Sequence, residues 1–353
     1  MKPNARFPNL ELPASARGCK LGACLNPAPH RSAPHRTAPH RTAPPQPCVI
    51  APVTEPAPNP SFDALRDWIG RTERRADTIT AAPLAGLAAT LDRVDEPAPT
   101  AGAPVPPLAH WLYFLPQAPA HEIGVDGHPK RGGFLPPVPL PRRMWAGGRL
   151  RFERPLRVGD TVQRVSTIQN VQTKHGRSGT LVFVTVKHEV IDAHGVALHE
   201  EHDIVYRDNP VASKVAGAAP PAPAAAPTDE RFSRVITPDP VLLFRYSALT
   251  FNGHRIHYDR PYATEVEGYP GLIVHGPLIA TLLLDLLLDR LRRERPTASV
   301  SAFEFKAASP LFDTHPFTVC GKFAADGSAA PSAMLWARNH LGQLAMQARA
   351  ELA

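Results

Sequence analysis

The sequence predicts an α+β fold in which two curved antiparallel sheets each wrap a central helix. Two observations predict it: a helical segment followed by a series of strands occurs twice along the chain, and a segment of alanine and proline separates the two series. A sheet with one apolar face must bury that face, and a helix inside its curve does so. The 353 residues are enough for two such domains with full cores.

Residues 1–58 have the composition of a disordered head. The pattern Ala-Pro-His-Arg followed by Ser or Thr begins at Ala28 and repeats at Ala33 and Ala38. Proline at this frequency opposes helix and sheet, and little in the head is apolar enough to be buried. Seven basic residues and one acidic residue precede Glu55, so the head carries nearly all of the net charge of +7. The remainder is almost neutral, and we expect no nucleic-acid partner.

Cysteine usage predicts a reducing compartment. Three of the four cysteines lie in the head and only Cys320 lies in the predicted folded region, so an internal disulfide is not expected there. No cysteine or histidine spacing is typical of a zinc site, and we expect no metal. The head lacks the apolar run of a secretory signal. A cytoplasmic protein is therefore expected, and an organelle transit peptide in the arginine-bearing head stays the alternative.

The first domain is expected at residues 59–210. Two helices should come first, one capped by Ser61 and one carrying Leu84, Leu87 and Leu91 at helical spacing. A loop rich in proline and glycine follows at 97–108. Strands are then expected around Val162–Ile168, at Leu181–Ile191 and at Val196–Tyr206, with a turn at Asp192–Gly195 between the last two.

A linker is expected at residues 211–228, because Ala218–Pro227 consists of alanine and proline alone. The second domain, 229–353, repeats the plan of the first. Its helix is expected at Pro277–Arg293. Its strands are expected at Val300–Lys306, Phe317–Phe323, Ser332–Arg338 and Gln343–Leu352, with hairpin turns at Asp326-Gly327 and Asn339–Gly342.

Two pairs of short motifs support the repeat. Phe152 followed by Pro155-Leu156 matches Phe305 followed by Pro310-Leu311. The turn Asp192–Gly195 matches Asn339–Gly342.

The helix of the second domain is apolar nearly all round. Its apolar stretch has the length of a membrane span, but His275 and Asp285 interrupt it. A central helix enclosed by a curved sheet accounts for the pattern better, so we expect no membrane partner.

Three motifs in order carry the candidate chemistry. Phe251-Asn252-Gly253-His254-Arg255-Ile256-His257 is followed by His275-Gly276, which opens the apolar helix. The segment resembles the signature of the MaoC-like, R-specific enoyl-CoA hydratase family, which has Asp-x-Asn-Pro-aliphatic-His and then His-Gly. Here Asn252 stands for the Asp and His254-Arg255 for Asn-Pro.

This variant of the signature is similar to the hydroxyacyl-thioester dehydratase type 2 branch of that family. Met144–Gly148 and Glu153–Asp160 are similar to the degenerate N-terminal domain of the branch, and the resemblance covers about residues 60–352. It implies a double hotdog fold and a cytoplasmic hydro-lyase. The two hotdogs are expected to pair within the chain around one active site, and a homodimer stays open.

The resemblance also implies the roles of the site residues. His257 is the expected acid–base group, since an imidazole titrates near neutrality and can take a proton from water and return it. Asn252 is expected to orient the water, although an amide cannot accept a proton as the usual Asp does. His275 and Gly276 are expected to bind the thioester oxygen at the start of the helix. Weaker substrate contacts are expected from Arg255, Tyr246 and Trp145.

The implied substrate is an α,β-unsaturated acyl-CoA, with coenzyme A as part of the substrate and no further cofactor. Resemblance to bacterial members of the branch favours hydration of mesaconyl-C4-CoA (3-methylfumaryl-CoA) to citramalyl-CoA. Three alternatives stay open: a 3-hydroxyacyl-thioester dehydratase of broader specificity, a hotdog thioesterase that uses Asp285, and a non-catalytic acyl-thioester-binding protein.

Overall fold

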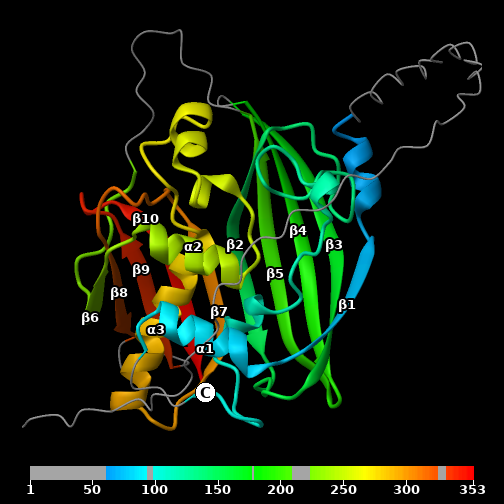
Figure 1. Cartoon of the computed structure of the whole chain (residues 1–353). Helices are drawn as coiled ribbons and strands as arrows, with labels where there is room; N and C mark the ends of the chain where they lie inside the picture. The colour runs from blue at the N-terminus through cyan, green and yellow to red at the C-terminus, as the bar shows by residue number, and fades with distance from the viewer. Residues whose placement is uncertain (1–60, 94–97, 177–178, 209–222, 325–330) are drawn as a thin grey trace, which may run out of the picture. The chain divides into compact units, whose positions relative to one another are not determined.

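The computed structural model describes residues 61–93, 98–176, 179–208, 223–324 and 331–353, all within one compact unit, Ala57–Ala353. These residues form one antiparallel sheet of ten strands, with helices on one side of it (Figure 1). The strands are β1 (Thr72–Thr78), β2 (Arg142–Phe152), β3 (Thr161–Gly176), β4 (Gly179–Asp192), β5 (Gly195–Arg207), β6 (Phe232–Ile236), β7 (Val300–Ala307), β8 (Phe317–Phe323), β9 (Ser332–Arg338) and β10 (Leu344–Leu352). The helices are α1 (Ala81–Thr90), α2 (Pro240–Leu249) and α3 (Gly276–Glu294), and the shorter turns are η1 (Ala64–Trp68), η2 (Ala109–Leu112), η3 (Ala120–Glu122), η4 (Arg255–His257) and the π-helical η5 (Tyr262–Val266).

The sheet is symmetric about its middle. Its order is β1-β3-β4-β5-β2-β7-β10-β9-β8-β6, so each half contributes five strands in the same sequence from the edge inward. The halves join where β2 pairs with β7, with Gly147 opposite Lys306. A Cβ on Gly147 would lie 2.6 Å from the carbonyl oxygen of Phe305. Glycine therefore permits the two backbones to approach at the seam.

The predicted pairs of motifs occupy equivalent places in the two halves. Leu156 and Leu311 are both buried. The turn Asp192–Gly195 joins β4 to β5 and Asn339–Gly342 precedes β10, and each ends on a glycine with positive φ, 104° at Gly195 and 73° at Gly342. Glycine adopts this conformation without steric cost, which permits a tight hairpin.

Several elements differ from the sequence-based expectations or were absent from them. The helix expected after Ser61 is only the 3-10 turn η1, although the Ser61 hydroxyl does accept a hydrogen bond from the backbone N–H of Ala64 (3.3 Å). The strand β1 follows it, and both β6 and α2 were also missed. The residues of β1 are almost all polar, because it is an edge strand with one exposed row of side chains. Such a strand lacks the apolar alternation by which strands are predicted.

The central helix of the second half is α3, which packs against β8, β9 and β10. Leu278, Leu283 and Leu287 are fully buried in the main core. In the first half the counterpart is α1, which has ten residues instead of nineteen and packs on α2. Within the described ranges, no helix is both long and apolar enough to cross a membrane.

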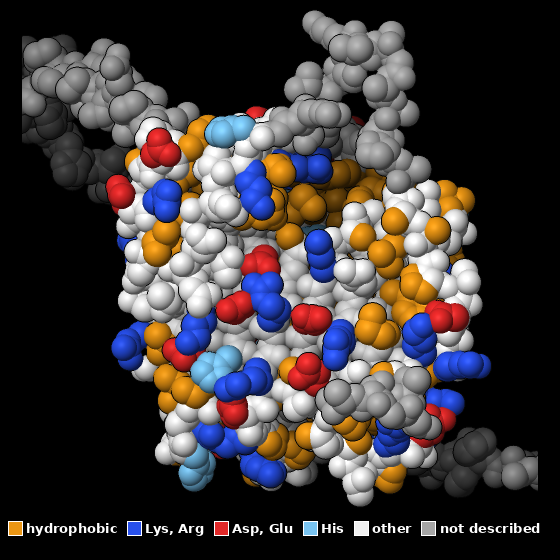
Figure 2. Space-filling model, turned by 180° about the vertical axis from the view of Figure 1, so that it is seen from behind, with side chains coloured by type: hydrophobic (Ala, Val, Ile, Leu, Met, Phe, Trp, Pro, Cys, Tyr) orange, Lys and Arg blue, Asp and Glu red, His pale blue; other side chains and the backbone are white. Residues whose placement is uncertain are grey.

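Acidic and basic side chains intermingle on the face of the molecule turned away from these helices (Figure 2). Ion pairs join neighbouring strands of the sheet, for example Arg149 of β2 with Glu201 and Asp203 of β5 at 2.6 and 2.8 Å. Opposite charges alternate there, so the described residues of this face form no single-sign patch for a polyanion.

Some expectations concern residues outside the described ranges. They are the head at 1–58, the turn at Asp326-Gly327 and the linker at 211–228 up to residue 222. Where the described chain resumes, Ala225 forms an isolated β-bridge with Gln343.

Candidate active site

The candidate site begins at the turn that follows α2. The carboxylate of Asp239 caps α2 by accepting a hydrogen bond from the backbone N–H of Leu242 (2.7 Å). After the helix, Phe251 adopts a positive φ of 48°, which reverses the chain. The Oδ1 of Asn252 then accepts a hydrogen bond from the backbone N–H of His254 (3.0 Å). Since Oδ1 is used in the turn, the amide Nδ2 is the group that Asn252 can offer to a ligand.

His257 lies at the end of η4 and is buried, with 7% of its surface exposed. Its Nδ1 lies 2.7 Å from the carbonyl oxygen of Ile273, so Nδ1 carries the proton and Nε2 has a free lone pair. Burial lowers the pKa of His257 to about 4, partly offset by this hydrogen bond. A neutral imidazole with an unprotonated Nε2 is the form that can accept a proton from water.

His275 is placed differently from its expected role at the thioester. It precedes the first residue of α3, and none of its surface is exposed. Its Nε2 lies 2.8 Å from the Ser247 hydroxyl, and its ring stacks on that of His257 with centroids 3.7 Å apart. His275 does not line the cavity, and in this position its ring supports that of His257. Its expected contact with the thioester oxygen stays a prediction, which this placement does not support.

Gly276 begins α3, where the first backbone N–H groups have no partner within the helix. A Cβ on this residue would come no closer than 3.8 Å to another residue, at the carbonyl oxygen of Trp145. Protein packing therefore does not require glycine here. Its role in binding the thioester oxygen stays a prediction, which the open space and the adjacent cavity residue Pro277 support.

A cavity of about 860 Å³ adjoins this turn and is lined by both halves of the chain. The second half contributes Tyr246, Asn252 and Pro277, and the first contributes Trp145 among others. His257, His275, Gly276 and Arg255 are not among the lining residues. The predicted water-binding amide thus faces the cavity, while the predicted acid–base group lies behind the turn.

Tyr246 and Trp145, two of the weaker predictions, both line this cavity. Burial raises the pKa of Tyr246, and a hydrogen bond with Thr281 opposes that rise. The indole N–H of Trp145 donates to the carbonyl oxygen of Gly147 (2.9 Å), and its ring lies 3.8 Å from that of His202. Both side chains are held by the protein, so they present fixed walls to a ligand.

Arg255 is used within the protein and does not face the cavity. Its guanidinium pairs with Asp259 at 2.7 Å, donates to the carbonyl oxygen of Val125 (3.1 Å) and lies over the ring of Tyr262. The ion pair with Asp259, which was the alternative to substrate binding, is present, and a substrate contact of Arg255 stays a prediction. The guanidinium joins the turn at 252–257, the candidate catalytic turn, to Val125 of the first half of the chain.

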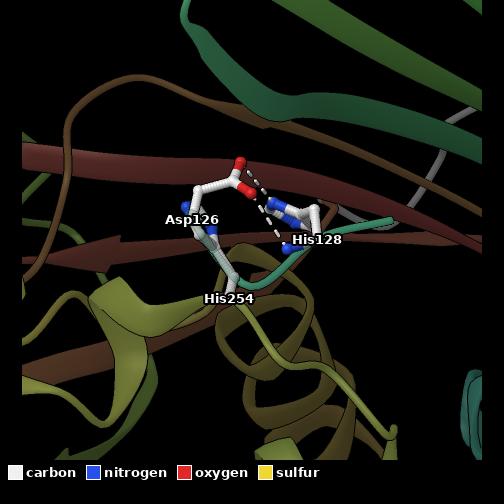
Figure 3. A group of neighbouring side chains, drawn as sticks. All are labelled: Asp126, His128 and His254. Atoms are coloured by element: carbon white, nitrogen blue, oxygen red, sulfur yellow. Dashed lines mark hydrogen bonds and ion pairs between the residues drawn. The ribbon is translucent and has the colours of Figure 1, made fainter. Parts of the chain in front are cut away.

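Three side chains that no sequence spacing connects lie together next to the turn: Asp126 and His128 of the first half and His254 of the second (Figure 3). Asp126 accepts hydrogen bonds from the backbone N–H of His128 (3.0 Å) and, through its other oxygen, from Nδ1 (3.2 Å). The rings of His128 and His254 have centroids 4.0 Å apart. Burial lowers the pKa of His128 to about 4, reinforced by the charge of Arg143 and opposed by Asp126.

These three side chains offer metal-ligand atoms within 4.8 Å of one another. However, both oxygens of Asp126 and Nδ1 of His128 already take part in hydrogen bonds. A metal bound through those atoms would have to break them, so the arrangement fits a carboxylate–imidazole pair better than a metal centre.

Part of the cavity wall is polar. Arg164 of β3 lines it together with His188, Glu200 and His202. Arg164 has no hydrogen bond or ion pair to another described residue, and its Nε is buried. Burial lowers the pKa of Arg164, and the nearby charge of Glu200 opposes this. The sequence signal was a charged residue inside the β-branched run around Val162–Ile168, which the sequence reasoning did not use.

Asp285, the carboxylate that a thioesterase would need, is engaged elsewhere. It forms ion pairs with Arg93 and with Arg234, the latter at 2.6 Å, and it does not line the cavity. Asp289 pairs with the same two arginines. These carboxylates join α3 to the turn after α1 and to β6, which leaves the thioesterase alternative without its nucleophile or base.

The two-part sheet and its central helix define the chain as a double hotdog protein, and comparisons with solved structures agree. A MaoC-like dehydratase superposes with a TM-score of 0.59 at 14% identity, covering 82% of this chain and 99% of that one. A protein of Mycobacterium tuberculosis described as having a double hotdog fold superposes with a TM-score of 0.50 at 15% identity, covering 83% of this chain and 98% of that one.

Sequence comparison defines the family. The model of the hydroxyacyl-thioester dehydratase type 2 family matches residues 108–313. A mesaconyl-C(4)-CoA hydratase of Chloroflexus aurantiacus is 49% identical over 258 residues, which is 72% of this chain and 88% of that protein. The chain belongs to the hydroxyacyl-thioester dehydratase type 2 family and is a hydro-lyase.

Proposed function

We propose that the protein reversibly hydrates mesaconyl-C4-CoA to citramalyl-CoA, at a site that both halves of the chain form. The observation that carries the proposal is the catalytic turn: the Nδ2 of Asn252 is free at the cavity, and behind it His257 keeps an unprotonated Nε2 next to the start of α3. The 49% identity to the Chloroflexus mesaconyl-C(4)-CoA hydratase supports the choice of substrate.

In this mechanism Asn252 orients a water molecule through its amide, and His257 takes one proton from that water. The water oxygen bonds to Cβ, and the π electrons move to the thioester oxygen as an enolate. The backbone N–H of Gly276, at the positive end of α3, stabilises the negative charge. The enolate then returns its electron pair to Cα, which gains a proton and completes the hydration.

Arg164 supports a dicarboxylic acyl group. Mesaconyl-C4-CoA carries a free carboxylate at the end remote from the thioester, and this anion needs a cation inside the cavity. Arg164 offers a guanidinium at the cavity wall without an ion pair to another described residue. A guanidinium binds a carboxylate with two parallel hydrogen bonds, which a neutral acyl chain cannot accept.

The test is a hydration assay on two thioesters, mesaconyl-C4-CoA and crotonyl-CoA, followed by the loss of the conjugated thioester absorbance. We expect the dicarboxylic substrate to have the higher kcat/KM. Hydration of crotonyl-CoA alone would support the alternative, a dehydratase of broader specificity. Binding of both thioesters without turnover of either would support the non-catalytic alternative and overturn the proposal.

Three further expectations belong to the same proposal. The reaction needs no cofactor, since the proton transfers and the stabilisation of the enolate are assigned to side chains and to the backbone. The protein acts in the cytoplasm, which the single cysteine of the predicted folded region supports. The two hotdogs already pair within the chain, and self-association into a homodimer is open to measurement of the mass in solution.

A further inference from the structure

The loop Ile123–Pro129 of the first half is built against the catalytic turn of the second. The backbone N–H of Arg255 donates to the carbonyl oxygen of Asp126 (2.9 Å). A Cβ on Gly127 would lie only 1.8 Å from the carbonyl oxygen of Gly253. No side chain fits between the two backbones, so the loop has one position relative to the turn.

Within this loop, Asp126 orients the imidazole of His128. Its two oxygens accept the backbone N–H and Nδ1–H of His128, at 3.0 and 3.2 Å. This fixes the tautomer and leaves the lone pair of Nε2 free. An imidazole held by a carboxylate is the usual arrangement of a side chain that transfers protons.

His128 also lines the cavity, beside Asn252 and Gly253, whereas His257 does not. The ring of His254 lies between the two imidazoles, with centroids 4.0 Å from His128 and 5.4 Å from His257. Two imidazoles therefore flank the same turn, one from each half of the chain. Asn252 between them cannot exchange a proton.

We propose that His128, oriented by Asp126, is a second catalytic imidazole that exchanges the proton at Cα. The inference rests on the proposed hydration. His257 takes the water proton as the oxygen bonds to Cβ, and protonated His128 gives its Nε2 proton to Cα as the enolate electron pair forms the C–H bond. Burial lowers the pKa of His128 to about 4, so near neutral pH hydration uses the small protonated fraction of His128, which solvent refills. In the dehydration direction the Nε2 lone pair of neutral His128 removes that Cα proton. Exchange with solvent returns both imidazoles to their starting states, and Asp126 is a positioning residue.

The first experiment measures kcat and KM of His128→Gln in the full chain, on mesaconyl-C4-CoA and on crotonyl-CoA. We expect kcat to fall about 100-fold on both, with KM within about threefold, because proton transfer is lost and binding is kept. Asp126→Asn keeps the size of the side chain and should lower kcat about tenfold, since it removes the charge that stabilises the protonated imidazole. The control is His121→Gln, an exposed histidine of the preceding η3 turn, which should match the wild type.

A second experiment separates chemistry from folding. Asn252→Asp in the His128→Gln background restores a proton-transferring group to the turn and should raise kcat at least about tenfold. Added imidazole should also restore turnover to His128→Gly. If His128→Gln keeps kcat within about threefold of the wild type, or if neither rescue works, the proposal is overturned. Loss of wild-type activity to a chelator, reversed by Zn²⁺, would overturn it in favour of a metal site.

The assay distinguishes failure of this inference from failure of the proposed function. If the wild type hydrates crotonyl-CoA but not mesaconyl-C4-CoA, the substrate proposal is wrong, and the fall in kcat of His128→Gln on crotonyl-CoA still tests the imidazole.

Discussion

The two hotdog halves have the same strand order but differ at the central helix. In the second half α3 has nineteen residues and begins at Gly276, and the catalytic turn precedes it. In the first half α1 has ten residues, and no described side chain caps its start. The cavity wall of the first half includes polar side chains of the strands, among them Arg164 and His202. The second half contributes Asn252 of the candidate motif and Pro277 of α3 to the same cavity.

Both halves hold buried polar groups, but the partners differ. In the first half Glu200 of β5 is 4% exposed and accepts hydrogen bonds from His110 and from the indole N–H of Trp111, both at 3.0 Å. In the second half Ser247 and His275 are buried and pair at 2.8 Å. Buried polar groups of this kind are tolerated only when they are hydrogen-bonded. The first half therefore buries a carboxylate beside the cavity, whereas the second half buries neutral groups at the start of α3.

The first prediction concerns a substitution at the start of α3, where the two halves differ in helix length. Gly276→Ala adds a methyl group where the nearest atom of another residue is 3.8 Å away, so the melting temperature should stay close to that of the wild type. If the thioester oxygen binds the backbone N–H there, kcat/KM should fall about 100-fold. Gly133→Ala, in an open position of the first half, is the matched control. Unchanged kcat/KM in Gly276→Ala would remove the helix start from the mechanism.

The second prediction concerns Arg164, the arginine of the first half that lines the cavity. Arg164→Met should lower kcat/KM for mesaconyl-C4-CoA about 10- to 100-fold, the worth of a hydrogen-bonded ion pair, and change crotonyl-CoA little. Arg74→Met replaces an exposed arginine on the neighbouring strand β1 and should leave both substrates unaffected. An equal loss on both substrates would mean that Arg164 supports the fold and not the free carboxylate.

A smaller effect is expected on the free energy of unfolding below neutral pH. Buried histidines of both halves contribute to it. Burial lowers the pKa of His128, His188 and His257 to about 4 and that of His202 to about 3. The unfolded chain therefore binds protons from about pH 6.5 downward while the folded chain does not, and stability falls as the pH falls. Above that pH all of these groups are neutral in both states and the stability is fully present.

Thermal melting across pH 4 to 8 measures this slope. His188→Gln should flatten the fall between about pH 6.5 and 4, because one proton-excluding group is removed. His194→Gln, in the exposed turn between β4 and β5, should leave the slope as it is. A melting temperature that is constant down to pH 4 would show that these rings take up protons in the folded protein.

The sequence predicted the fold well where apolar periodicity and turn residues coincide. The bounds of β8 and β9 are those expected, and α3 differs from expectation by one residue at each end. The prediction missed β1, because its residues are polar and lie at an exposed edge. It also missed β2, because Gly147-Gly148 resembles a break in a strand. At the seam this glycine pair permits close contact with β7, and such a requirement exists only in the assembled sheet.

The site was predictable only within the continuous motif. Asn252, His257 and Gly276 lie within 25 residues of one another and match a family signature. His128 and Arg164 come from the other half of the chain. Arg164 is a charged residue inside a β-branched run, but no spacing connects it or His128 with the motif. They reach the cavity because the two halves of the sheet join where β2 pairs with β7. This is a tertiary contact that spacing along the chain does not encode.

The most direct test of the account is the turnover of His257→Ala and Asn252→Ala on mesaconyl-C4-CoA and crotonyl-CoA. His257→Ala should lower kcat by about two to four orders of magnitude with little change in binding, since a proton-transfer group is lost. Asn252→Ala should cost less, about the value of one or two hydrogen bonds to the transition state. Near-normal turnover of His257→Ala on every thioester would contradict the assignment of the chemistry to the second half.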